Sequence, residues 1–162
     1  MRRIIQTEHP RTLVLENAVE RRLTAMEPGP VRDTAMALAR DIRDGGGTAI
    51  GPLIQRVSPN ERTDAPATHE TTLIRQSETP LDARLTSEVA VHDRLEVPGC
   101  VLARFRGDAS DIQIIYSKIA VHAYENDLTL DGTVYLVFVD EDHEDFAVDA
   151  FASTAGEEHA GR

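Results

Sequence analysis

This chain of 162 residues has few cysteines and no long apolar run, and each absence excludes a class of structure. Cys100 is the only cysteine, so an intramolecular disulfide is impossible and a cysteine-based zinc site is not expected. We expect Cys100 to be a small buried apolar residue. No apolar run reaches about 18 residues, so no membrane span is expected. The first residues, MRRIIQTEHPRT, lack the apolar segment of a secretory signal, and the expected location is the cytoplasm.

Lysine is nearly absent, and the charge balance is strongly acidic. Lys118 is the single lysine among 17 basic residues, against 28 acidic ones, which gives a formal net charge of −11. A nucleic-acid interface needs clustered basic side chains against the phosphate backbone, so direct nucleic-acid binding is not expected. An acidic surface could instead meet a basic face of a partner protein.

Two segments carry the apolar periodicity of a helix. The first, residues 30–44, begins at a proline and ends before the three glycines Gly45–Gly47. The second, residues 110–125, begins with Ser110 and Gln113 at the spacing of a capping box. The apolar stripes are Val31, Ala35, Leu38 and Ile42 in the first helix, and Ile112, Ile115, Ile119 and Ala123 in the second.

Strand-like segments flank both helices, and their order repeats. Gly29 and Gly51 of the first half match Gly107 and Gly132 of the second, which indicates a duplication. We therefore predict an α+β fold of two duplicated strand-helix-strand-strand halves with antiparallel sheets. We expect two main helices on one side of this fold and a groove between the halves. The predicted strands are residues 19–26, 50–57, 71–75, 87–91, 100–105, 133–139 and 146–153.

The expected organisation is one domain over residues 1–155, with halves at about 12–77 and 85–153. Residues 156–162 are expected to form a flexible acidic tail. The polar stretches 58–70 and 140–145 are expected to be mobile connections.

A sequence pattern runs through the second half. Pro98-Gly99 predicts a turn before a strand, Gly107 follows that strand, Tyr116 comes nine residues later in the helix, and Tyr135 lies in the next strand. Together with GPLIQRV at residues 51–57, this pattern resembles the GyrI-like effector-binding domain, a small-molecule module of many bacterial and archaeal regulators. The resemblance covers about residues 12–153 and implies a domain that binds small molecules.

Two positions depart from the pattern of that family. His122 stands where a tryptophan is usual, and Thr133 stands where a glutamate is usual. In related domains the glutamate faces the pocket, pairs with cationic ligands and serves catalysis in a hydrolytic subgroup. Thr133 therefore argues against both cation recognition and hydrolysis at this position.

The expected ligand-binding residues combine this resemblance with the aromatic pattern. Aromatic rings offer contact area at low entropy cost, and hydroxyl groups orient a polar ligand group. For Tyr135 and Phe105 the alternative is a place in the sheet core, and for His122 it is a structurally bonded or solvated histidine. The predicted ligand-binding set is Tyr116, Tyr135, Phe105, His122, Thr133, Met26 and Leu53.

Catalytic residues, cofactors and metals are not expected. The acidic run at residues 140–145 lacks the glycine turn and distal glutamate of a calcium loop. Gly45–Gly47 follows a helix and does not open one, as a phosphate cradle would require. Arg21 and Arg22 could meet an anionic ligand or keep a strand edge soluble.

The resulting hypothesis is a stand-alone ligand sensor or a module associated with a transcription regulator, which binds a small apolar or aromatic compound. An enzyme is less expected, but a hydrolase of small strained or electrophilic compounds stays an alternative. It would need a carboxylate such as Glu70, Glu88 or Glu96 in the groove. A second alternative is a protein-interaction module that inhibits or protects a partner enzyme through its acidic surface.

Overall fold

The computed structural model describes residues 4–23, 28–59, 69–81, 89–140 and 146–155. The side chains of residues 28–31 and 140 are not among those described. The elements follow one another as β1 (Ile4–Arg22), α1 (Pro28–Asp44), β2 (Ala49–Pro59), β3 (His69–Ser77), β4 (Val89–Gly107), the 3₁₀ turn η1 (Ala109–Asp111), α2 (Ile114–Glu125), β5 (Leu130–Asp140) and β6 (Phe146–Thr154).

The order of elements repeats, and so does the pairing of strands. In the first half β3 pairs antiparallel with both β1 and β2, and in the second half β6 pairs antiparallel with both β4 and β5. The last strand of each half therefore lies between the other two. The predicted α+β fold of duplicated halves with antiparallel strands is confirmed.

The chain divides into two compact units. Unit 1 contains Met1–Leu13 and Val97–Arg162, and unit 2 contains Val14–Glu96. Strands β1 and β4 each cross a boundary, so each contributes a segment to both units. The prediction of a single domain over residues 1–155 stays a prediction.

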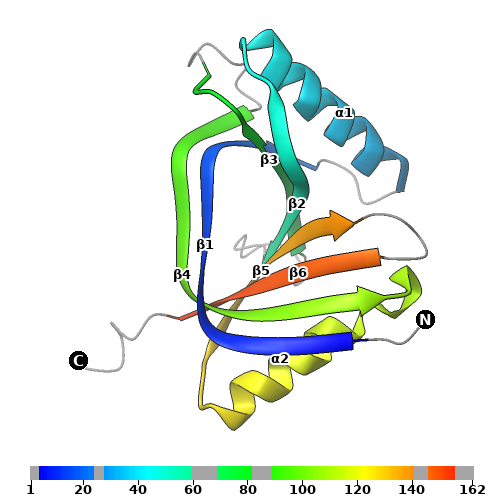
Figure 1. The fold of residues 1–162 in the computed structure, drawn as a ribbon, viewed down its shortest axis with the longest axis vertical. Helices are drawn as coiled ribbons and strands as arrows, with labels where there is room; N and C mark the ends of the chain where they lie inside the picture. The colour runs from blue at the N-terminus through cyan, green and yellow to red at the C-terminus, as the bar shows by residue number, and fades with distance from the viewer. Residues whose placement is uncertain (1–3, 24–27, 60–68, 82–88, 141–145, 156–162) are drawn as a thin grey trace, which may run out of the picture. The chain divides into compact units, whose positions relative to one another are not determined.

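In unit 1, α2 covers one face of β4, β5 and β6 (Figure 1). Ile115 and Ile119 of the predicted apolar stripe of α2 belong to one core cluster with alternate residues of these three strands. Because alternate residues of a strand point to opposite faces, the intervening residues point away from α2. The residues on the α2 side are Val101, Ala103, Phe105, Leu136, Phe146, Val148, Ala150 and Ala152.

In unit 2, α1 packs against β2 and β3 (Figure 1). Leu38 and Ile42 of the predicted stripe are fully buried in a cluster with Val19 and Leu73. The helix ends at Asp44, and Gly46 in the glycine run adopts a φ of +85°, which glycine tolerates without strain. The predicted helix stop is confirmed.

An ion pair of unit 2 lies largely out of contact with solvent. The Arg56 guanidinium donates two hydrogen bonds to the Glu20 carboxylate, at 2.6 and 3.2 Å. The side chains of Glu20 and Arg56 are only 10% and 24% exposed. His92 Nε2 lies 3.5 Å from the same carboxylate. Glu20 is adjacent to Val19 of the core, so it points to the face of the strands away from α1.

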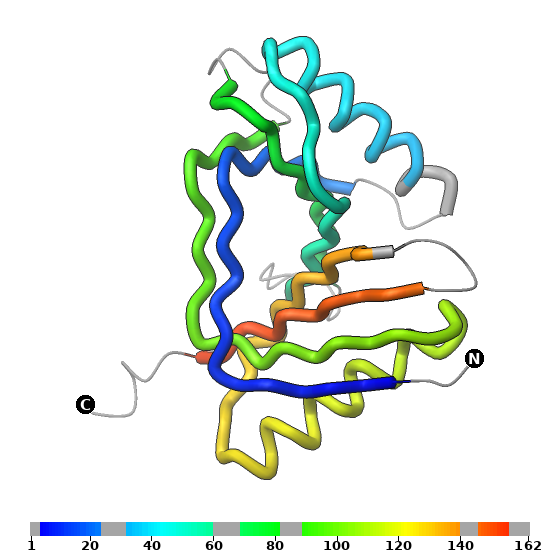
Figure 2. The backbone as a smooth tube through the Cα atoms, in the orientation of Figure 1, coloured from blue at the N-terminus to red at the C-terminus, as the bar shows by residue number. Residues whose placement is uncertain are grey.

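The two longest strands correct the sequence prediction. Strand β1 has 19 residues, although only the part from residue 19 onward was predicted. Strand β4 also has 19 residues and joins the two strands predicted at 87–91 and 100–105. The predicted turn at Pro98-Gly99 is wrong, since the strand continues through it (Figure 2). Gly99 has a φ of +69°, which lets the backbone deviate without ending the strand.

The start of the second helix is also corrected. A 3₁₀ turn comes first, and α2 begins at Ile114. The predicted capping box of Ser110 and Gln113 is wrong, because the Asp108 side chain accepts hydrogen bonds from the backbone N–H and the hydroxyl of Ser110. Both bonds go to Asp108 Oδ1, at 2.9 and 2.7 Å, so the capping side chain lies two residues before the predicted cap.

Some predictions fall where the structure gives no description. Most of the predicted mobile connections and the whole predicted tail lie outside the described residues, as does Met26. Neither of the described helices is long and apolar enough to cross a membrane.

Removing the buried carboxylate of unit 2 should be costly. We expect Glu20→Ala to lower the free energy of unfolding by about 3 kcal/mol, because Arg56 loses both carboxylate contacts in a place with little solvent. Glu16→Ala on the same strand is the matched control. Glu16 pairs with Arg94 at 2.8 Å, but both side chains are more than half exposed, so the loss should stay below about 1 kcal/mol. Urea unfolding measures both, and equal losses would contradict the expectation.

Candidate functional site

The predicted site residues of α2 lie on the helix-covered side of the strands. Tyr116 is half-buried, and burial raises the pKa of its hydroxyl above the ordinary value. His122 is half-buried near the end of the helix, where its backbone carbonyl accepts a hydrogen bond from the Asn126 side chain at 2.8 Å. Phe105 of β4 is 2% exposed and packs edge-on against Phe146, with ring centroids 6.4 Å apart.

The predicted residues of β5 occupy a different environment. Tyr135 is 7% exposed and pairs in register with Phe151. Its neighbour Leu136 belongs to the core under α2, so Tyr135 points to the opposite face. Thr133 is half-buried, and its backbone N–H donates to Asp131 Oδ1 at 2.9 Å. The sheet therefore separates Tyr135 from Tyr116, and the structure does not bring these two tyrosines together.

Leu53, from the first half, lies in unit 2. It is half-buried and packs against the core cluster under α1. The ligand-binding role of the predicted residues stays a prediction, as does the groove expected between the halves.

A hollow of about 470 Å³ opens within unit 1. Its volume falls in the range of small-molecule pockets, which is about 300–1,000 Å³. Arg104, Arg106, Ala147 and Asp149 alternate with core residues of the α2 side, so the hollow lies on the face turned away from α2. The lining residues are Ile4, Gln6, Arg104, Phe105, Arg106, Val139, Ala147 and Asp149.

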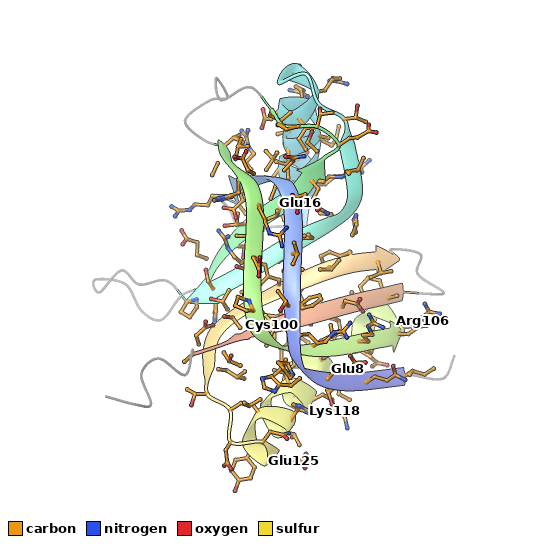
Figure 3. The ribbon with its side chains drawn as sticks, turned by 60° about the vertical axis from the view of Figure 1, so that its left-hand side comes forward. Glu8, Glu16, Cys100, Arg106, Lys118 and Glu125 are labelled. Carbon is orange, nitrogen blue, oxygen red and sulfur yellow. The ribbon has the colours of Figure 1, made fainter. Side chains whose placement is uncertain are left out.

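Strand pairing sets the charged groups of the hollow beside one another. Arg104 of β4 is directly opposite Asp149 of β6, and Arg106 is opposite Ala147. Arg104 Nε lies 3.7 Å from Asp149 Oδ1, beyond hydrogen-bond length. Figure 3 shows Arg106 near the end of β4, and Glu8 on the first part of β1.

Asp149 is the most unusual group of the hollow. Its side chain is 25% exposed, and burial raises the pKa of the carboxyl above its ordinary value. Arg104, Arg106 and Arg11 act in the opposite direction by stabilising the carboxylate, and Glu8 adds to the rise. Desolvation outweighs the arginines, so the carboxylate is held in a site that solvates it poorly.

Sequence reasoning missed Asp149 and both arginines, although a signal was present. Residues 146–153 read FAVDAFAS, a strand that alternates apolar and polar residues. Asp149 is the one charged residue in that strand, which indicates a place on the face away from the core. Its partners could not be named without the strand register, because Arg104 is 45 positions away in the chain.

The arginines and carboxylates that the sequence suggested for ligand binding or hydrolysis, where the structure describes them, lie outside the hollow and form ion pairs. Arg21 donates to Asp41 at 2.6 Å and Arg22 pairs with Glu70, so both form ion pairs inside unit 2. Glu96 accepts from Arg94 at 3.1 Å. Glu88 lies outside the described residues.

The prediction for Cys100 is confirmed. The residue is fully buried, and its thiol lies 3.4 Å from the backbone carbonyl of Val97, to which it donates. Burial raises the pKa of the thiol to about 11, so the reactive thiolate is scarce at neutral pH.

Comparisons with solved structures find the same fold. EcmrR, in a complex with DNA, superposes with a TM-score of 0.63 over 94% of this chain at 7% identity, and this chain spans 57% of the EcmrR chain. A hydrolase from Listeria innocua gives 0.61 at 11% identity, over 93% of this chain and 91% of the other. SAV2435 bound to tetraphenylphosphonium gives 0.51 at 11% identity, over 98% of both chains. No family model and no curated protein matches the sequence.

The raised pKa of Asp149 gives a prediction for stability against pH. A carboxyl with a folded pKa above its unfolded value stabilises the fold fully below the unfolded pKa, about 3.9 for aspartate, and loses that contribution as the pH rises through the folded pKa. Asp149→Asn removes the titration. We therefore expect the stability of the variant relative to wild type to be higher at pH 7 than at pH 3.

Urea unfolding of both proteins across this range measures the difference. Asp93→Asn, at an exposed aspartate of β4, serves as the control for a general change in net charge. A relative stability of Asp149→Asn that falls with rising pH would show that the arginines, and not desolvation, dominate at this carboxyl.

Proposed function

We propose that this chain is a GyrI-like small-molecule-binding domain, and that the hollow of unit 1 is its binding site. The observation that carries the proposal is the composition of the hollow. Apolar side chains of Ile4, Val139 and Ala147 lie beside charged groups in a space of about 470 Å³. Such a combination can bury the apolar body of a ligand and orient its polar group.

We infer that the binding site extends beyond the hollow along β5 and β6. Tyr135 and Phe151 are paired in register and lie one row further along the strands than Val137 and Asp149. Both alternate with core residues, so they belong to the face that carries the hollow. Aromatic rings at this position would give a planar ligand a surface for stacking.

The comparisons support the proposal at the level of fold. One protein of similar fold was determined with tetraphenylphosphonium bound, and another, EcmrR, was determined in a complex with DNA. The role we infer for this chain is therefore that of a ligand sensor, acting alone or beside a regulator. A partner protein stays a prediction.

Hydrolysis is the second candidate, and Asp149 is the observation that favours it. Two solved structures of similar fold are hydrolases from Listeria innocua. A half-buried carboxyl with a raised pKa in a hollow has the character of a general base. Sustained turnover of a neutral aromatic ester such as 2-naphthyl acetate, lost in Asp149→Asn, would favour hydrolysis over binding alone.

Filling the hollow tests the binding site directly. Val139 lines the hollow and is 54% exposed, so a larger side chain can be accommodated without disturbing the core. We expect Val139→Trp to weaken binding of the neutral planar dye Nile red by at least about tenfold, the equivalent of about 1.4 kcal/mol. Dye fluorescence during titration gives the dissociation constant.

Val121→Trp is the matched control for this experiment. Val121 is 52% exposed on α2, in the same unit but on the other side of the strands. Its dissociation constant should equal that of wild type. If both variants bind the dye as wild type does, the hollow is not the site where the dye binds.

A further inference from the structure

The charges of the described side chains that line the hollow do not balance. Among the lining residues that the structure describes, the charged groups are the guanidinium groups of Arg104 and Arg106 and the single carboxylate of Asp149. The next charges that act on Asp149 are those of Arg11 and Glu8, which pair with each other at 3.4 Å and cancel. The described part of this site therefore carries a net positive charge, although the whole chain carries −11.

The ion pair of unit 2 shows what a satisfied arginine–carboxylate contact in this protein looks like. Glu20 accepts two hydrogen bonds from Arg56, and both side chains are mostly buried. Arg104 and Asp149, in contrast, make one contact at 3.7 Å with Arg104 half exposed. Among the residues that the structure describes, Arg104 and Arg106 form no hydrogen bond through their guanidinium groups. Their donors are available to a ligand.

The two arginines are also placed to act together. They are two residues apart on β4, so their side chains leave the same face of the strand, about 7 Å apart along it. A planar guanidinium donates parallel hydrogen bonds to a carboxylate, and such charge-assisted pairs are stronger than neutral ones. The apolar side chains of the hollow lie next to them.

We propose that the hollow selects an anionic ligand, namely an aromatic or aliphatic carboxylate. Its apolar part lies against Ile4, Val139 and Ala147, and its carboxylate accepts hydrogen bonds from Arg104 and Arg106. Asp149 opposes the ligand charge and competes for Arg104, which limits affinity and favours ligands with a single negative charge. This assignment rests on the proposed binding role of the hollow and adds the chemical class of the ligand.

Three naphthalene probes of nearly equal shape distinguish the effect of ligand charge on affinity from the effect of apolar contact. They are 2-naphthoate, 2-naphthalenemethanol and 2-naphthylmethylammonium, which carry one negative charge, none and one positive charge. Calorimetric titration into the full chain should give the tightest binding for 2-naphthoate. We expect it to exceed the ammonium probe by at least about tenfold, or about 1.4 kcal/mol.

Substitutions then assign the preference to particular side chains. Arg106→Gln should weaken 2-naphthoate by about tenfold and leave 2-naphthalenemethanol within about twofold. Lys118→Gln is the matched control, since Lys118 is an exposed cation on α2 in the same unit (Figure 3). It removes the same net charge and should leave all three affinities within about twofold. Asp149→Asn should tighten 2-naphthoate and weaken the ammonium probe, a change opposite in sign to that of Arg106→Gln.

The possible results separate the two proposals. Tighter binding of the ammonium probe, or equal weakening of 2-naphthoate by Arg106→Gln and Lys118→Gln, would overturn the anion preference while leaving the binding role intact. The binding role itself fails if none of the three probes and no Nile red binds. Because Arg106 is exposed, its variant should keep the thermal unfolding midpoint of wild type, and Arg104→Gln provides a second test of the same donors.

Discussion

The packing of α2 against its three strands is the interaction on which the hollow depends. Ile115 and Ile119 share a core cluster with alternate residues of β4, β5 and β6, and the buried members of this cluster are all apolar. The side chains between them have only the opposite face available. A shift of β6 by one residue would carry Asp149 into the core and Val148 out of it, at the cost of burying a charge. Hydrophobic burial on one face of the strands thereby fixes which charged side chains lie on the other face.

The two halves have the same arrangement of strands, so their ion pairs can be compared directly. Both units place an arginine–carboxylate pair on the strand face away from the helix. In unit 2 the pair is short, doubly hydrogen-bonded and largely buried, which gives a closed structural element. In unit 1 the equivalent charges are separated, one carboxyl is poorly solvated, and a hollow lies over them. The difference in function that we infer follows from the difference in pairing, with the topology unchanged.

Much of the fold could be predicted from local patterns, but the candidate site could not. Both apolar stripes and the position of most strands follow from periodicity, which is a property of neighbouring residues. The long strands were missed because Pro98-Gly99 is typical of a turn, whereas here the positive φ of Gly99 lets β4 continue. The hollow depends on which residues of β4 and β6 lie opposite each other, and that register follows from tertiary packing. Family resemblance directed attention to Tyr116 and Tyr135, which the structure places on opposite faces of the strands.

The crossing of both long strands between units affects how the chain can fold. Unit 2 is one continuous stretch, whereas unit 1 is assembled from the two ends of the chain. The hydrogen bond between Glu16 and Arg94 shows that the stretch begins and ends side by side. Once unit 2 has formed, the segments that continue into unit 1 therefore leave it as neighbours, and the entropy of closing a loop of more than eighty residues is already lost. Unit 2, once folded, therefore raises the effective concentration of residues 1–13 for their partners in the rest of unit 1. The sheet of unit 1 can be completed only after residues 97–162 are available, although its first segment comes first in the chain.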